Sequence, residues 1–196
     1  MDLRYPVTRY VYRPVSVPIA TVVAKTRITP VQVTWVSALL ALAGAAAFAV
    51  DAYVAGAFLT LAGVITDCVD GDLARITGRS STFGAFLDSV LDRATDGAMI
   101  LGLAISNPDH YGVVAGFALL GSVLTSYVRA RAQSLGADCP EGIGGRDVRI
   151  LILVVAAFTG YIYGGLLAVA IAGGITSLHR AINAGRHLRA QERIGR

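Results

Sequence analysis

The sequence predicts an all-α membrane protein with six transmembrane helices preceded by an N-terminal interfacial amphipathic helix. The 196 residues are 55% hydrophobic and only 15% charged, with a mean hydropathy of +0.62, whereas a soluble domain carries about 25% charged residues. Apolar stretches of about twenty residues, the length that a bilayer requires, recur along the chain. We expect a single domain over residues 1–196, with a juxtamembrane segment at 1–27 and a six-helix bundle at 28–190.

Basic side chains mark one side of this predicted bundle. They precede the first span, follow the second and the fourth, open the fifth and close the chain, whereas the connections near Asp51, Asp109 and Tyr161 carry no Lys or Arg. The positive-inside rule makes the basic side cytoplasmic and places both termini there. A net charge of +4 could also suit nucleic acid, but the same arginines satisfy the topology rule in a strongly apolar chain, so no nucleic-acid partner is expected.

The elements follow one another with short connections. Residues 3–25 mix arginine and tyrosine with valine, isoleucine and proline, a composition typical of an amphipathic segment on the cytoplasmic leaflet. Thr29 and Pro30 predict a helix start, as N-cap and first helical residue. The spans are expected at about 30–50, 53–75, 82–106, 110–135 and 146–163, with a sixth that continues to about 188.

Turn residues predict the connections between these spans. Ser81 is expected to cap the third span, and Asn107-Pro108 to end it. Residues 136–145 hold four glycines and a proline and predict a cytoplasmic loop. Gly164-Gly165 predicts a tight turn between the last two spans.

Six aspartates lie within thirty positions, in segments that otherwise resemble membrane spans: Asp67, Asp70, Asp72, Asp88, Asp92 and Asp96. A carboxylate in a bilayer is costly unless it is paired, bound to a metal or facing water. The first two are three residues apart, and the last three are four apart, so each set shares a helix face. Because the two helices are antiparallel neighbours, four carboxylates can meet around one point.

Such a cluster predicts a site for metal and diphosphate. Hard divalent cations relieve the repulsion between carboxylates, and oxygen-only ligands indicate Mg²⁺ or Mn²⁺. Four carboxylates suit two ions that keep open positions for phosphate oxygens. Gly71 and Ala74 leave room for a ligand, and Arg75, one turn past Asp70 and Gly71, can meet a phosphate.

The spacing resembles the signature of the CDP-alcohol phosphatidyltransferases, D-x2-D-G-x2-A-R-x8-G-x3-D-x3-D. Its fixed positions are all met, by Asp67, Asp70, Gly71, Ala74, Arg75, Gly84, Asp88 and Asp92. The resemblance implies that an acceptor hydroxyl attacks the β-phosphorus of a CDP-linked donor and that CMP leaves. It also implies two metal ions held by Asp67, Asp70, Asp88 and Asp92, with Asp92 as the catalytic base, and a homodimer among membrane lipids.

The same resemblance assigns the donor contacts. Gly71, Ala74, Arg75 and Gly84 would bind the donor, and Ser81 would offer a hydroxyl and a helix N-terminus to phosphate. Gln32 and Thr34, in the segment that opens the first span, would also contact it. Asp72 and Asp96 lie outside the signature. We expect a surface role for Asp72, and for Asp96 a supporting role as partner of Arg93 or of a buried donor.

The acceptor is predicted from four further arginines at the cytoplasmic ends of the helices: Arg129, Arg146, Arg149 and Arg180. They favour a phosphorylated polyol and resemble the branch that uses inositol phosphate, the phosphatidylinositol-phosphate and di-inositol-phosphate-phosphate synthases. Inositol-1-phosphate is therefore the expected acceptor. Glycerol-3-phosphate, as in phosphatidylglycerophosphate synthases, is an alternative, and the arginines could instead serve only topology or lipid headgroups.

A divalent-cation transporter is the alternative from a different class, because acids within spans mark ion pathways. It predicts polar residues that continue to the far side, whereas the acids end about mid-span at Asp96. We therefore favour a multi-pass transferase with its site on the cytoplasmic side.

Overall fold

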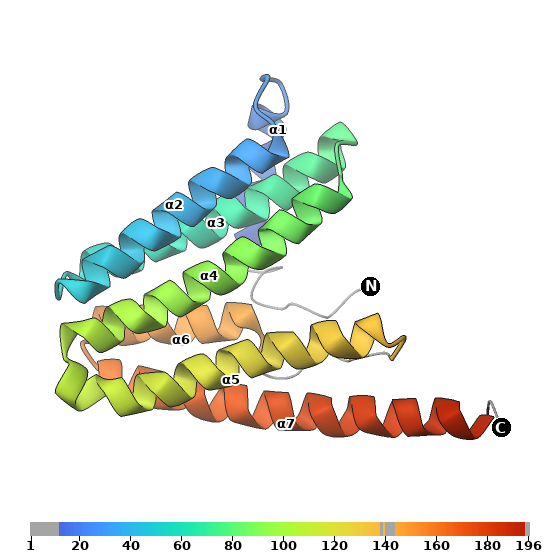
Figure 1. Ribbon diagram of the computed structural model, residues 1–196. Coiled ribbons are helices and arrows are strands. Elements are labelled where there is room, and N and C mark those ends of the chain that lie inside the picture. Colours follow the sequence, from blue (N-terminus) through green and yellow to red (C-terminus); the bar gives the residue numbers. More distant parts are fainter. Residues whose placement is uncertain (1–11, 138, 140–143, 195–196) are drawn as a thin grey trace.

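The computed structural model describes residues 12–137, 139 and 144–194, and within them all regular structure is helical (Figure 1). Residues 3–11 of the predicted juxtamembrane segment, and residues 138 and 140–143 of the predicted loop, lie outside the described residues. The helices are α1 (Arg13–Val23), α2 (Pro30–Ala49), α3 (Tyr53–Thr77), α4 (Thr82–Ser106), α5 (Pro108–Ser134), α6 (Arg146–Thr159) and α7 (Ile162–Ile194).

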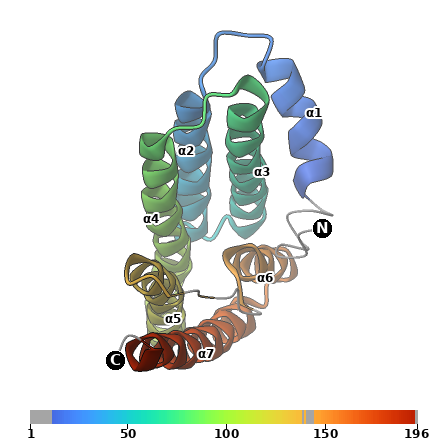
Figure 2. The same cartoon turned by 90° about the vertical axis from the view of Figure 1, so that its right-hand side faces the viewer.

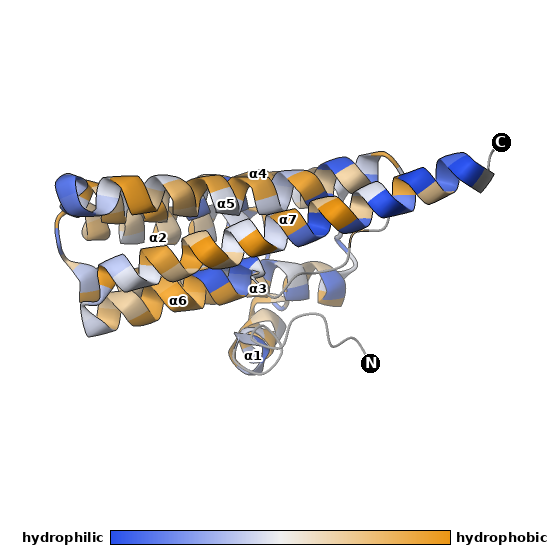
Figure 3. Ribbon diagram, turned by 90° about the horizontal axis from the view of Figure 1, so that it is seen from below, coloured by the Kyte–Doolittle hydropathy of each residue, from blue (hydrophilic) through white to orange (hydrophobic). Residues whose placement is uncertain are grey.

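The helices form two groups of three. Helix α2 packs against both α3 and α4, and α7 packs against α5 and α6. The contacts of α4 with α5 and of α3 with α6 join the two groups. Helix α1 lies against α3 on the outside of the first group and runs across the direction of the other helices (Figures 2 and 3).

Four helices, α2, α3, α5 and α7, are long and apolar enough to cross a membrane. Helix α4 has 25 residues but carries Asp88, Asp92, Arg93 and Asp96, and α6 has only 14 residues. Apolar residues cover the bodies of α5, α6 and α7, whereas the C-terminal end of α7 is mainly hydrophilic (Figure 3). The predicted all-helical class is therefore confirmed, with four helices that could cross a membrane.

The predicted helix starts are confirmed. Thr29 and Gln32 form a capping box at α2, in which the Thr29 backbone N–H donates to Gln32 Oε1 at 2.9 Å and the Gln32 N–H to Thr29 Oγ1 at 3.3 Å. Ser81 caps α4 by accepting from the Gly84 N–H at 3.0 Å. Asn107 ends α4 and caps α5. These caps satisfy backbone N–H groups that a helix start otherwise leaves unpaired.

The predicted turn at Gly164-Gly165 is wrong. Helix α6 ends at Thr159, and Gly160 supplies the left-handed conformation with φ of +74°, which a glycine adopts at little cost. Gly164 and Gly165 lie inside α7. Gly165 faces Ala156, and any side chain at Gly165 would collide with that residue's Cβ. The glycine is thus a packing residue, not a turn residue, and α7 also runs to Ile194, past the expected end near 188.

Small residues let α3 and α4 approach α2 closely. An added Cβ at Gly102 of α4 would collide with the Ala45 carbonyl oxygen of α2, and one at Gly63 of α3 would lie 3.1 Å from the Ala41 backbone nitrogen. The apolar core includes Phe48, Met99 and Leu103, each at most 2% exposed. This packing fixes how α3 and α4 present their carboxylates.

We expect Gly102→Ala to destabilise the protein by about 1–3 kcal/mol, because the helices must separate to admit the methyl group. Thermal unfolding of the detergent-solubilised protein should show a melting temperature lower by about 5 °C. Gly116→Ala in α5 is the matched control, since no atom lies within 4 Å of its added Cβ. Equal melting temperatures for the two variants would contradict the close-contact argument.

Candidate active site

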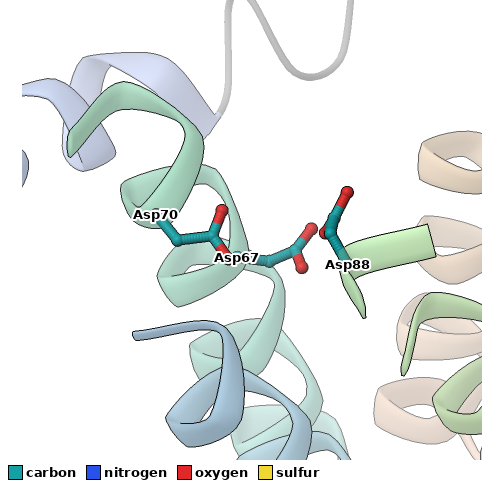
Figure 4. A group of neighbouring side chains, drawn as sticks. All are labelled: Asp67, Asp70 and Asp88. Atoms are coloured by element: carbon teal, nitrogen blue, oxygen red, sulfur yellow. The ribbon is translucent and has the colours of Figure 1, made fainter. Parts of the chain in front are cut away.

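Three carboxylates from two helices converge near the turn between α3 and α4 (Figure 4). Asp67 and Asp70 project from α3 and Asp88 from α4, and one oxygen of each lies within 4.8 Å of the others. The short connection after Thr77 makes the two helices antiparallel neighbours, so the last turns of α3 face the first turns of α4. The structure therefore brings together three of the four metal ligands that the sequence predicts.

Helix α2 supports this cluster through Thr34. Its hydroxyl donates to Asp70 Oδ2 at 2.5 Å, and both residues are buried. Thr34 is predicted to contact the donor, and its hydroxyl here orients one of the carboxylates. Gln32, the other expected donor contact on α2, is exposed, and its Oε1 atom is engaged in the helix cap.

Asp92, the fourth predicted ligand, lies beside the guanidinium group of Arg146. Arg146 Nη1 is 3.0 Å from Asp67 Oδ2 and 2.6 Å from Asp92 Oδ1, and Arg146 Nε donates to Asp96 Oδ1 at 3.0 Å. The Asp92 contact lacks hydrogen-bond geometry, so this buried oxygen has no hydrogen-bond partner among the described residues. The other oxygen of Asp92 accepts from Arg93 Nη1 at 2.8 Å. Arg146 thus joins α6 to both helices of the cluster.

Asp96 pairs with two arginines of α6, Arg146 and Arg149. It does not pair with Arg93, which is one of the partners that the sequence predicts. Besides Arg146, it pairs with Arg149 Nη2 at 3.5 Å. Arg149 is 4% exposed and also donates to the Gly144 carbonyl oxygen at 2.7 Å. Asp96 therefore does have the supporting position that its place in the aspartate stripe predicts, with partners that belong to a helix fifty residues away.

The carboxylates outnumber the guanidinium groups that pair with them. Within the described part of the chain, Asp70 and Asp88 have no basic side chain at ion-pair distance, and Asp88 accepts no hydrogen bond. Nevertheless both lie within 4.8 Å of Asp67. Like charges at this separation repel strongly in a medium of low dielectric constant, and an all-oxygen set of this kind suits a hard divalent cation. The residues present therefore fit the predicted metal.

The four arginines assigned to the acceptor phosphate lie on three helices, α5, α6 and α7. Arg146 and Arg149 contact the aspartates, whereas Arg180 of α7 is buried and donates to the Thr125 carbonyl oxygen of α5 at 2.8 Å. Arg129 follows Thr125 by one helical turn on α5. Gly144 links Arg149 to the helix of Arg180. Its carbonyl oxygen accepts a hydrogen bond from Arg149, and its N–H donates to Thr176 Oγ1 at 3.1 Å, one turn before Arg180 on α7.

Asp72 is buried, contrary to the expected surface role. It is 3% exposed and receives hydrogen bonds from Arg13 and Ser16 of α1 and from Arg75. Its place two residues after Asp70 does turn it away from the metal ligands, and that side of α3 is covered by α1. Arg13 and Ser16 are three residues apart, and so are Asp72 and Arg75, so each pair shares a helix face, but this spacing does not say that the two faces meet.

The remaining donor residues line the same end of α3 and α4. Gly71 has open space above it except for the Arg75 guanidinium, whose terminal nitrogens lie 3.7 Å from the position of an added Cβ. Ala74 follows one turn later on α3 and is half-buried. Gly84 lies at the start of α4 and packs on Ser81 Oγ. These small residues leave the backbone open beside the carboxylates.

Comparisons with known proteins agree with the family that the signature resembles. The profile of the CDP-alcohol phosphatidyltransferase family matches residues 27–178. The chain is 37% identical to the archaetidylinositol phosphate synthase of Methanothermobacter thermautotrophicus, over 74% of this chain and 76% of that protein. It is 36% identical to the phosphatidylinositol phosphate synthase of Cutibacterium acnes, over 71% and 70% of the two chains.

Solved structures are also similar. The phosphatidylinositol phosphate synthase of Mycobacterium tuberculosis with CDP-DAG bound superposes with a TM-score of 0.78 at 28% identity, covering 87% of this chain and 94% of that chain. The same enzyme in complex with manganese and citrate gives a TM-score of 0.79 at 29% identity, covering 87% and 88%. The chain belongs to the CDP-alcohol phosphatidyltransferase family.

Replacing Arg146 by glutamine should tighten the binding of divalent cations about tenfold, because its positive charge occupies the carboxylates that the ion would need. Two charges 4 Å apart near a protein surface interact by about 4 kcal/mol. A tenfold change in cation affinity corresponds to about 1.4 kcal/mol, which is a modest part of the repulsion between Arg146 and the ion. Free Mn²⁺ measured by electron paramagnetic resonance during titration of the purified protein would give the affinity.

Arg79→Gln is the control for this titration, since Arg79 is an exposed arginine just after α3. It removes the same charge without touching the aspartates and should leave the Mn²⁺ affinity within about twofold. Unchanged or weaker binding by Arg146→Gln would show that Arg146 does not compete with the ion.

Proposed function

We propose that the protein transfers a phosphoalcohol group, phosphatidyl or phosphoinositol, from a CDP-linked donor to an acceptor hydroxyl and releases CMP. The observation that carries this proposal is the meeting of Asp67, Asp70 and Asp88 within 4.8 Å, at the spacing of the family signature. The acceptor oxygen forms a bond to the β-phosphorus, the bond between that phosphorus and the bridging oxygen of CMP breaks, and the hydroxyl proton goes to a base.

The aspartates of α3 and α4 divide this work. Asp67, Asp70, Asp88 and Asp92 would hold two Mg²⁺ or Mn²⁺ ions, which when bound neutralise phosphate charge and make the hydroxyl a better nucleophile. Asp92 accepts the proton. Its Oδ1 atom is buried, lies 2.6 Å from Arg146 Nη1 and accepts no hydrogen bond in the described part of the chain, and this unused hydrogen-bonding capacity supports the role.

Donor binding is assigned to the residues around this centre. Arg75 meets the diphosphate, Gly71, Ala74 and Gly84 let the donor approach the backbone, and Ser81 offers its hydroxyl at the start of α4. Gln32 and Thr34 would contact the donor from helix α2. In the M. tuberculosis relative, CDP-DAG occupies a chain of the same fold, which supports a CDP-linked donor here.

Inositol-1-phosphate is the proposed acceptor, a phosphorylated polyol that Arg129, Arg146, Arg149 and Arg180 would bind. Arg146 and Arg149 are anchored beside the aspartates, so they can place an acceptor phosphate near the reacting centre. Relatives are named archaetidylinositol phosphate synthase and phosphatidylinositol phosphate synthase. A bifunctional IPC transferase and DIPP synthase of Rubrobacter xylanophilus is 36% identical over 90% of this chain, which spans 42% of that protein. Glycerol-3-phosphate is the alternative acceptor.

The same assignment places the protein in the membrane as a single domain. We infer six spans within the bundle of residues 28–190, in which α4 and α6 cross beside the four helices that are long and apolar enough to span a membrane. The juxtamembrane segment 1–27 would place α1 at the cytoplasmic interface. Both termini and the active site would face the cytoplasm. A homodimer among membrane lipids is part of this proposal, since small residues on the spans permit close helix contacts.

A cation-transport function has less support from the structure. Beyond Asp96, the next buried side chains of α4 are Met99, Ile100 and Leu103, which are apolar and at most 2% exposed. A pathway for a divalent ion needs polar ligands along its length. The carboxylates therefore form a site at one end of the bundle.

Asp92→Asn should lower CMP release by at least about a thousandfold, because it removes both a metal ligand and the base. The assay uses purified protein with Mg²⁺ and a CDP-linked donor. The melting temperature should stay within a few degrees of the wild-type value. Asp109→Asn, an exposed aspartate at the opposite end of α4 and α5, is the matched control and should keep full activity. Full activity of Asp92→Asn would refute the base assignment.

The acceptor can be identified by crossing donors with acceptors in the same assay. CDP-diacylglycerol, CDP-archaeol and CDP-inositol are each paired with inositol-1-phosphate, glycerol-3-phosphate, inositol and serine. We expect CMP release with inositol-1-phosphate to exceed that with inositol by at least about a hundredfold, because buried cations left without a phosphate partner are costly. Comparable rates with an uncharged acceptor would contradict the role of the arginines.

A further inference from the structure

Asp72 lies where the signature residues of α3 meet helix α1, and both of its oxygens are occupied. Oδ1 accepts from Arg75 Nη2 at 2.6 Å and from Arg13 Nη2 at 3.1 Å, and Oδ2 accepts from Ser16 Oγ at 2.7 Å. Its side chain is 4% exposed, and Ser16 is fully buried. A carboxylate with this many partners has one orientation available, so it is a rigid point on the helix surface.

Arg75 is the exposed partner in this arrangement. Its side chain is 62% exposed, and the contact with Asp72 is the hydrogen bond that anchors it. An exposed arginine ordinarily samples many rotamers and loses that freedom when it binds a ligand. The Asp72 carboxylate removes part of this freedom before any ligand arrives.

The position that Asp72 selects is next to the metal cluster. The Arg75 guanidinium lies over Gly71, with Nη1 and Nη2 each 3.7 Å from the place where a Cβ of residue 71 would be. Gly71 adjoins Asp70, one of the three clustered carboxylates. The guanidinium therefore stands at the edge of the site with its remaining N–H groups available to an anion.

We propose that Asp72 is a positioning residue that holds the Arg75 guanidinium in place for the diphosphate of the CDP-linked donor. This inference rests on the proposed function. Asp72 acts through Arg75 and does not itself touch the donor. The hydrogen bond from the fully buried Ser16 of α1 keeps the carboxylate in place, so the Arg75 contact does not depend on Arg13.

A double-mutant cycle separates positioning from mere stabilisation of the fold. The variants are Asp72→Asn, Arg75→Gln and the double variant, in the full-length, detergent-solubilised protein with Mg²⁺. Each is measured by the dissociation constant for CDP from calorimetry and by the donor KM in the CMP-release assay. Asp72→Asn keeps the shape of the side chain and an oxygen for Ser16, but loses the charge that holds Arg75.

We expect Asp72→Asn alone to weaken CDP binding and to raise the donor KM about tenfold, with the acceptor KM within twofold. In the Arg75→Gln background the same substitution should change either quantity by less than twofold. A tenfold loss in both backgrounds, or no loss in the wild-type background, would overturn the proposal, because either result means that Asp72 does not act through Arg75.

Arg13→Gln is the matched control. It removes the α1 arginine from the same carboxylate but leaves the Arg75 contact, so CDP affinity should stay within twofold of the wild-type value. A loss as large as that of Asp72→Asn would assign the effect to the docking of α1 and refute positioning. The double-mutant cycle could show the expected effects on CDP affinity while the wild-type protein releases no CMP from any donor. In that case the proposed reaction is wrong and the positioning role of Asp72 stands.

Discussion

Charge balance at one end of the bundle is the constraint on which the rest of the structure depends. Carboxylates of Asp67, Asp70, Asp88, Asp92 and Asp96 share a partly buried space in which Arg146 contacts three of them. A buried charge without compensation is strongly unfavourable. The Arg146 guanidinium of α6 offsets part of the repulsion between the carboxylates of α3 and α4. The negative charge that remains would favour the binding of a divalent cation.

The backbone serves this balance by bringing the helices close. Where α2 meets α4 at Gly102, and α2 meets α3 at Gly63, the absence of a side chain lets the main chains touch. Thr34 then reaches Asp70 from α2, and Asp88 comes within ligand distance of Asp67. Dense apolar packing below the site resists rearrangement, so the carboxylates are held at their separations although they repel one another.

Two arginines illustrate how one residue type serves different ends in this site. Arg146 is only 24% exposed and is surrounded by carboxylates, whereas Arg75 is largely exposed and is tied to a single one. Membership of the family accounts for the aspartates and for Arg75. Asp72 and its partners on α1 lie outside the signature, and they show that the residues between the fixed positions of the motif also shape the site.

The sequence by itself determined the helical class, the helix starts and the composition of the acidic cluster. Thr29, Ser81 and Asn107 act within their own turn, and Asp67, Asp70 and Asp88 lie on two helices joined by a short turn, so local spacing suffices. Tertiary structure alone decided that Arg146 sits among the aspartates, that Asp72 is buried under α1, and that Gly165 packs on Ala156 while Gly160 makes the turn. The contacts of Arg146 and of Asp72 join elements far apart in the sequence, and that of Gly165 joins two consecutive helices. In each case helical periodicity tells which face a residue occupies but not which helix covers that face.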